Sequence, residues 1–165
     1  MYRYVLAEAP GGYEVYVNLI ASSAGEYLSR RPHVLKLIRE VLATIDLTKS
    51  RMTIERDMGR VIGNTDIVKT SETDNIFYAR PLKKSVFSRF AKNRNPSPSR
   101  KLTIFFEQDT EGSYEILDIW IGPYTPPFPG DTKETTKSQV YWQEHALVEG
   151  AQTIQTKTIT RECPY

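Results

Sequence analysis

The sequence predicts an α+β fold in which an antiparallel β-sheet packs with two main helices and starts with an N-terminal β-hairpin. The prediction rests on the order of the patterns: a hairpin comes first, then a helix, several strands and a second helix. The length of 165 residues, 39% of them apolar, is enough for a hydrophobic core. We expect a single domain over residues 1–165, with the hairpin and first helix (1–48) as an N-terminal subregion.

The N-terminal hairpin is predicted by two segments of alternating polarity, residues 2–8 and 13–20. Between them, Pro10-Gly11-Gly12 is a turn signal. A first helix over about 32–45 is predicted because Pro32 suits a first helical turn and because apolar residues then recur every three or four positions. We expect this stripe to pack against a sheet; it consists of Val34, Leu35, Leu37, Ile38, Val41, Leu42 and Ile45.

Further strands are predicted wherever the chain alternates or is rich in β-formers. They cover residues 51–55, 75–79, 102–107 and 114–122, and the last two form a hairpin. Residues 56–69 contain two glycines and are expected to be loop or broken structure.

Prolines and glycines shape the rest of the chain. The turn-forming segment 93–99 is predicted as a loop, and four prolines exclude strand and helix from 122–130. A second helix is predicted over 135–149, where Gly150 ends it and Trp142 lies in its buried stripe. A loosely alternating run at 153–161 is predicted as an edge strand.

The inventory of residues excludes several function classes. One cysteine excludes a disulfide framework within the chain, and with only two histidines there is no basis for a structural zinc site. The sequence lacks the phosphate-loop, dinucleotide-binding and zinc-protease motifs, and no apolar run reaches the roughly 20 residues that span a bilayer. We therefore expect a cytoplasmic protein with no cofactor, no metal and no membrane contact.

Positive charge is concentrated in one segment. Residues 80–101 hold eight Lys and Arg and no Asp or Glu, whereas the rest of the chain holds 14 basic and 20 acidic residues. The eight are Arg80, Lys83, Lys84, Arg89, Lys92, Arg94, Arg100 and Lys101. Such a basic segment can contact phosphates. The alternative is a solvated loop whose charges offset acidic neighbours.

Two histidines are the candidates for acid–base chemistry, because imidazole can transfer protons near neutral pH. His33 lies in the first turn of the first predicted helix, where a plain surface residue is the alternative. His145 lies on the second predicted helix, close to Tyr141 and Trp142 in the sequence. For His145 the alternative is a core or interfacial residue whose ring bonds a backbone carbonyl.

Three runs of this chain carry a resemblance. They are Ser88–Pro98 (SRFAKNRNPSP), Tyr114–Pro129 with its WIG and PPFP pieces, and Tyr141–Val148 (YWQEHALV). The chain resembles in these runs a family of small uncharacterised proteins that recur in bacteria and mobile elements.

A second resemblance concerns the order of elements. A helix followed by an antiparallel sheet is similar to the barnase, colicin D and RelE-like group of metal-independent ribonucleases. This implies RNA as substrate and no metal. The chain departs from that group because the matching strands show no clear threonine, serine or histidine signature.

The first function we expect is that of a metal-independent, toxin-like endoribonuclease. The RNA 2′-OH would attack the adjacent phosphorus, His145 would move the proton, and Arg89 and Lys92 would stabilise the developing charge. These three residues must then converge in one cleft. Other substrate contacts would come from the basic segment, namely Lys84, Phe90, Asn93 and Arg94. The Phe90 ring either stacks on a base or lies buried beneath the loop.

The second function we expect is that of a non-catalytic regulatory protein. The basic loop and the corner Pro127–Pro129 would bind nucleic acid or a protein partner. The partner is then RNA or a protein such as an antitoxin-like one. The two hypotheses differ in whether the candidate catalytic residues converge.

Overall fold

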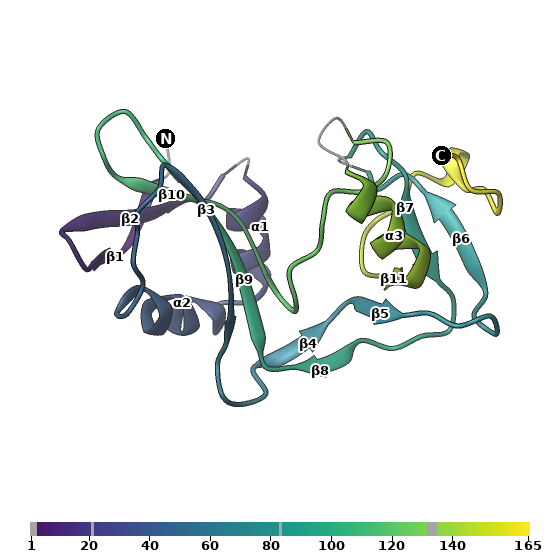
Figure 1. The fold of residues 1–165 in the computed structure, drawn as a ribbon, viewed down its shortest axis with the longest axis horizontal. Coiled ribbons are helices and arrows are strands. Elements are labelled where there is room, and N and C mark those ends of the chain that lie inside the picture. Colours follow the sequence, from purple (N-terminus) through teal and green to yellow (C-terminus); the bar gives the residue numbers. More distant parts are fainter. Residues whose placement is uncertain (1–2, 21, 83, 132–134) are drawn as a thin grey trace. The chain divides into compact units, whose positions relative to one another are not determined.

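The computed structural model describes residues 3–20, 22–82, 84–131 and 135–165. The chain divides into two compact units, each built from two separate stretches of sequence (Figure 1). Unit 1 comprises residues 1–61 and 100–123, and unit 2 comprises residues 62–99 and 124–165. The prediction of a single domain over residues 1–165 stays a prediction.

Unit 1 is built on a five-stranded sheet with the order β1-β2-β10-β9-β3. Its strands are β1 (Arg3–Ala9), β2 (Tyr13–Asn18), β3 (Arg51–Asp57), β9 (Lys101–Gln108) and β10 (Tyr114–Ile121). The two predicted hairpins are confirmed as β1–β2 and β9–β10, although Tyr2 of the first prediction lies outside the described residues. The strands pair antiparallel except β10 with β2, which are parallel.

Two helices belong to unit 1, α1 (Ser23–Arg30) and α2 (Val34–Leu42). The predicted stripe is confirmed for Val34, Leu37, Ile38, Val41 and Leu42, which are buried in α2, and the helix packs against β1. Helix α2 is shorter than the predicted 32–45, so Ile45 is buried beyond its end, and Leu35 is only half-buried. Helix α1 was not predicted. It approaches the end of β2 so closely that a Cβ at Gly25 would overlap the carbonyl oxygen of Asn18.

Leu42→Ala tests the packing of α2. Leu42 is fully buried, so the substitution removes apolar contacts and leaves a cavity. We expect the free energy of unfolding to fall by about 2–5 kcal/mol, measured by denaturant titration. An unchanged midpoint would contradict the packing, and Leu19→Ala, at an exposed position, is the control.

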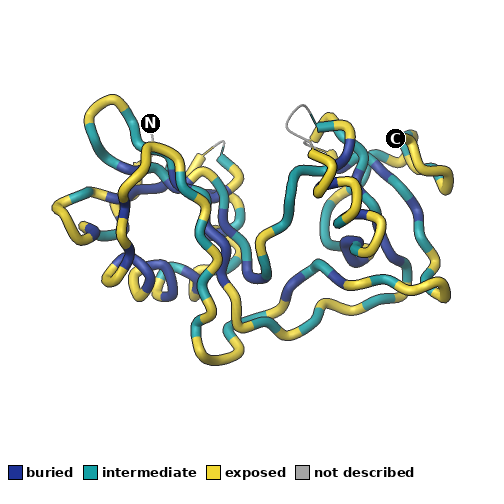
Figure 2. The backbone as a smooth tube through the Cα atoms, viewed as in Figure 1, coloured by how far each residue is buried: buried dark blue, intermediate teal, exposed yellow. Residues whose placement is uncertain are grey.

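Unit 2 contains a four-stranded sheet with the order β5-β11-β7-β6 and a two-stranded ribbon of β4 and β8. The strands are β4 (Gly63–Thr65), β5 (Ile67–Lys69), β6 (Ile76–Ala79), β7 (Ser88–Ala91), β8 (Ser97–Ser99) and β11 (His145–Val148). Helix α3 (Thr136–Glu144) leads into β11, and a short 3₁₀ helix, η1, covers Thr156–Thr158. Figure 2 shows buried positions along the strands of each unit and exposed positions at many turns.

The prediction of a purely antiparallel sheet is wrong. β11 pairs antiparallel with β5 but parallel with β7, so the sheets of both units are mixed. Parallel neighbours need a crossover connection, and the chain between β7 and β11 supplies one because it leaves unit 2 for β9 and β10 before it returns. The α+β class and the N-terminal hairpin are confirmed.

The second predicted helix is too long. Helix α3 ends at Glu144, and residues 145–148 form β11 instead. Ala146, Leu147 and Val148 are consecutive and all buried, which suits a central strand with both faces covered and not a helix with one apolar stripe.

Two predicted segments differ in detail. The predicted edge strand at 153–161 makes only isolated bridges, Pro81 with Ile154 and Tyr78 with Thr160, around η1. The predicted loop at 93–99 ends in the short strand β8, which pairs with β4.

No described helix is long and apolar enough to cross a membrane.

Candidate functional site

Strand β7 lies within the basic segment, and its residues alternate between the two faces of the unit 2 sheet. Phe90 packs with Phe77 and Leu147 in one cluster, whereas Ala91 packs with Ala146 and Val148 in another. We call these the Phe90 face and the Ala91 face. Because successive side chains of a strand point to opposite faces, Arg89 belongs to the Ala91 face.

Phe90 is a core residue. Its side chain is fully buried, and its ring stacks on that of Phe77 with centroids 5.2 Å apart. A base therefore has no access to the ring. The alternative prediction for Phe90, burial beneath the loop and not stacking on a base, is confirmed in that the ring is buried. The strand alternation of Ser88–Ala91 was the signal that could have placed it.

Arg89 is held by the neighbouring strands. Its Nη1 donates to the hydroxyl oxygen of Thr70 at 2.7 Å and to the backbone carbonyl of His145 at 3.1 Å. Tyr78, directly opposite Arg89 in β6, has its pKa raised by burial, so its phenol stays neutral across the physiological range. Arg89 thus ties β7 to the ends of β5 and β11.

The three residues after β7 also have structural partners. Lys92 places its ammonium 5.5 Å from the centroid of the Phe77 ring. Asn93 adopts the left-handed backbone region, with φ of 57°, which asparagine tolerates better than most residues and which turns the chain. Arg94 Nη1 donates to both carboxylate oxygens of Asp74 at 2.9 Å.

The Arg94–Asp74 pair predicts a pH dependence. The backbone N–H of Ser71, and then Arg94, hold the pKa of Asp74 below its usual value. The ionised carboxylate therefore stabilises the fold above about pH 4, and that contribution is lost as the pH falls through the lowered pKa. Asp74→Asn should lower the thermal midpoint at neutral pH.

The decrease caused by Asp74→Asn should shrink as the melt is repeated in increasingly acidic buffer. Glu72→Gln, at an exposed acid of the same loop, is the control and should leave the midpoint unchanged. A difference that stays constant down to about pH 2 would contradict the assignment.

The basic segment is divided between the two units. Arg100 pairs with Asp57 at 3.3 Å and Lys101 with Glu55 at 3.0 Å, both in unit 1. With Arg94, three cations of the segment offset acidic neighbours, as the alternative interpretation expects. Lys83 lies outside the described residues.

His145 is the first residue of β11 and is half-buried. Its ring stacks in parallel on the ring of Tyr141, with centroids 4.0 Å and planes 4° apart. Its Nδ1 lies 2.9 Å from the carbonyl oxygen of Tyr141. Since a carbonyl only accepts, Nδ1 is the donor, and in the neutral ring Nε2 is left as an acceptor.

The structure does not bring the three candidate catalytic side chains together. By strand alternation His145 shares the Phe90 face with Leu147, whereas Arg89 lies on the opposite, Ala91 face. Lys92 shares the Phe90 face, but the register of β7 with β11 places it beside Glu149. Glu149 is four residues from His145, which is about 13 Å along the strand. Arg89 reaches only the backbone of His145.

An aromatic row connects His145 to the core of unit 2. Trp142 is 2% exposed and contacts Phe128, with centroids 4.5 Å apart, and Tyr141, with centroids 5.1 Å apart. Lys84 places its ammonium 5.1 Å from the centroid of Phe128. The row ends at the surface in the stacked Tyr141–His145 pair.

A shallow depression of about 360 Å³ lies beside that pair. Its walls are mostly apolar, and it is lined by Thr136, Lys137, Val140, Tyr141, Glu144 and His145. Lys69 of β5 lies directly opposite His145 in the sheet and is exposed. We call the depression with Lys69 the Tyr141–His145 surface.

Sequence reasoning missed most of this surface. It singled out His145 but not Tyr141, Lys137 or Lys69. The four-residue spacing of Lys137, Tyr141 and His145, which places side chains on one side of a helix, was the available signal. His33 occupies the N-cap position of α2 in unit 1 without a side-chain cap hydrogen bond, is exposed and takes no part in the surface.

Net charge differs between the units. Unit 2 contains eleven Lys and Arg against eight Asp and Glu, and unit 1 contains eleven against twelve. The unit that carries the Tyr141–His145 surface is therefore the positive one.

Among the described residues, no three His, Cys, Asp or Glu side chains gather as metal ligands would.

No family model, curated protein or solved structure matches this chain. The two resemblances noted in the sequence stay predictions.

Proposed function

We propose that this protein binds single-stranded RNA through the Tyr141–His145 surface without cleaving it. The observation that carries the proposal is the parallel-stacked ring pair beside an apolar depression that Lys137 lines, with Lys69 opposite His145 in the sheet. Proteins hold single-stranded RNA by stacking bases on aromatic rings and by placing cations along the phosphates.

Five residues of the surface have a role in this proposal. A base enters the depression and stacks on the ring pair, while Lys137 and Lys69 neutralise the phosphates on either side of it. His145 Nε2 accepts a hydrogen bond from an amino or imino group of the base. Glu144, which also lines the depression, accepts from an amino or imino N–H of the base and disfavours a phosphate at that point.

The dispersal of the candidate catalytic residues supports binding over cleavage. A proton-transfer group must lie within hydrogen-bond reach of the reacting atoms, and charge stabilisation needs donors at the same place. Arg89 lies on the other face of the sheet, and Lys92 is about 13 Å along it. RNA is proposed as the ligand because a stacked ring pair beside lysines suits a nucleobase and its flanking phosphates.

Salt dependence tests the electrostatic part of the proposal. Fluorescence anisotropy with a labelled uridine-rich RNA should show affinity that falls linearly with salt on a log–log plot. Lys137→Ala should reduce the slope by about one, because it removes one phosphate contact. Lys36→Ala, at an exposed lysine of α2 in unit 1, is the matched control and should leave the slope unchanged.

Two results would contradict the proposal. One is the absence of RNA binding at about 50 mM salt, which would favour the protein-partner alternative. The other is cleavage of the RNA that His145→Ala abolishes, which would restore the endoribonuclease hypothesis.

A further inference from the structure

Strand β3 forms one edge of the unit 1 sheet and pairs only with β9 (Figure 1). The backbone N–H of Gln108 donates to the carbonyl of Ser50, and the N–H of Met58 donates to the carbonyl of Arg100. Even-numbered residues of β3 therefore bond to β9. The direction in which the backbone N–H and C=O groups point alternates along an antiparallel strand. The odd-numbered residues of β3, among them Arg51, Thr53 and Asp57, therefore direct these groups away from the sheet.

We propose that two copies of this chain associate by antiparallel pairing of β3 with β3, centred on Ile54. In this register Arg51 lies opposite Asp57 of the second copy, and Thr53 lies opposite Glu55. These pairs consist of odd-numbered residues, whose backbone N–H and C=O groups point outward. Each such pair can therefore form the hydrogen bonds of an antiparallel ladder between the two copies. The two five-stranded sheets become one continuous sheet.

The charges of β3 are complementary in this register. Arg51 and Asp57 are exposed, and they occur at the two ends of the strand, so a two-fold axis brings each one against the other. Within the chain Arg51 lies 3.6 Å from Glu107 and Asp57 lies 3.3 Å from Arg100. Pairing would extend each ion pair into a four-membered network of alternating sign, which is worth more than isolated surface pairs.

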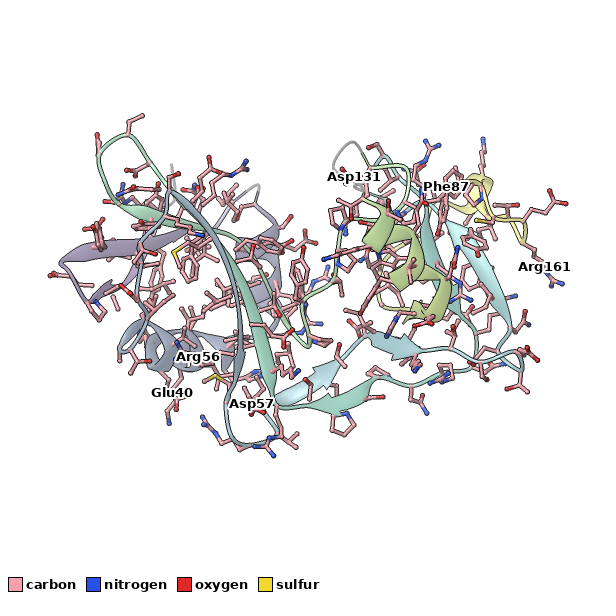
Figure 3. The ribbon with its side chains drawn as sticks, in the orientation of Figure 1. Glu40, Arg56, Asp57, Phe87, Asp131 and Arg161 are labelled. Atoms are coloured by element: carbon pink, nitrogen blue, oxygen red, sulfur yellow. The ribbon has the colours of Figure 1, made fainter. Side chains whose placement is uncertain are left out.

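The helix-facing side of β3 is also suited to the pairing. Ile54 is half-buried and would contact Ile54 of the second copy, which continues the apolar layer beneath both sheets. Met52 would lie opposite Arg56, whose Nη1 donates to the Thr44 hydroxyl oxygen at 2.8 Å. Figure 3 labels Arg56 and Asp57 near the end of β3 that leads to β4.

Three other pairings of the same edge are disfavoured. Parallel in-register pairing places Arg51 against Arg51 and Asp57 against Asp57. An antiparallel register shifted so that Glu55 faces Glu55 also opposes like charges. A shift by one residue moves the apolar side chains to the opposite face. Charged edges generally prevent association, and here the opposite charges at the two ends of β3 favour a second copy of the same strand as the partner.

Light scattering of the full chain at increasing concentration tests the proposal. The mass should rise from 18.9 kDa toward twice that value. Arg51→Asp or Asp57→Arg alone should raise the dissociation constant at least about tenfold, because each puts two like charges opposite each other in both halves of the dimer. An equimolar mixture of these two variants should associate again, since each charge then meets its opposite.

Two further variants locate the interface. Thr53→Pro removes an outward N–H without removing a bond to β9, and it should also weaken association. Arg30→Asp, a charge reversal on α1, should have no effect, and thermal melts confirm that every variant is folded. A mass of 18.9 kDa at all concentrations would overturn the proposal. So would a dimer that resists all three β3 substitutions, or single variants that fail to associate when mixed.

Discussion

Trp142→Ala is expected to lower the free energy of unfolding of unit 2 by about 3–5 kcal/mol, the cost typical of removing a buried tryptophan. The Trp142 side chain is 2% exposed and joins helix α3 to the proline-rich segment through Phe128. Its Nε1 donates to the carbonyl oxygen of Pro126 at 3.2 Å. The substitution therefore creates a cavity and removes a hydrogen bond at the same time.

The chain provides its own reporters for this measurement. It has two tryptophans, Trp120 in unit 1 and Trp142 in unit 2. In Trp142→Ala, fluorescence follows unit 1 alone, while circular dichroism follows the whole chain. Trp120→Phe is the reciprocal variant, because its fluorescence follows unit 2. Coincident transitions in both would support the single-domain prediction, and separate transitions would contradict it. An unchanged unfolding midpoint in Trp142→Ala would contradict the core position of the ring.

Tyr141→Ala is expected to weaken RNA binding by about 1–3 kcal/mol, the range for loss of one base-stacking ring. The substitution removes one of the two stacked rings, so the imidazole of His145 also loses the aromatic surface on which it stacks. Tyr141→Phe keeps the aromatic face and should bind RNA nearly as well as the original chain.

Anisotropy titration at one low salt concentration measures both Tyr141 variants. Circular dichroism must show that helix α3 is intact, because Tyr141 adjoins the buried Trp142. If both variants bind RNA as tightly as the original chain, no base stacks on this ring. If both variants lose affinity equally, the hydroxyl, not the ring, carries the interaction.

Local periodicity predicted the elements whose pattern is unambiguous. The stripe of α2 and the alternation of β1, β2, β9 and β10 are each repeated over several residues, so one face is clearly apolar. Helix α1 is short and contains Gly25, which lowers helix propensity. That glycine is required by the close approach of α1 to the end of β2, a tertiary contact that the sequence does not display.

The end of α3 shows why pairing partners cannot be predicted from one segment. The apolar run at 146–148 follows a helix without a glycine or proline between them. Its strand conformation depends on β5 and β7, which lie on either side and come from distant sequence. Non-local pairing overrides the local pattern here.

The candidate site was predicted in part. His145 lies on the proposed surface, and Lys84 lies against Phe128 in the aromatic row. The density of positive charge predicted that Arg89 and Arg94 contact the substrate. Instead, the Arg89 guanidinium bonds to the start of β11, and the Arg94 guanidinium bonds to Asp74 in a loop. The strand alternation that separates Arg89 from His145 depends on the register of β7 with β11, which no single run of sequence contains.

Photocrosslinking of the full chain to a 5-bromouridine RNA tests the central claim most directly. Ultraviolet irradiation joins a halogenated base to a residue that touches it, and mass spectrometry of the digest identifies the peptide. Crosslinks are expected within residues 136–145, with Tyr141 or His145 as the attached side chain and a loss of the signal in Tyr141→Ala. Crosslinks confined to residues 1–61 or 100–123, or no crosslink at a concentration that saturates binding, would contradict it.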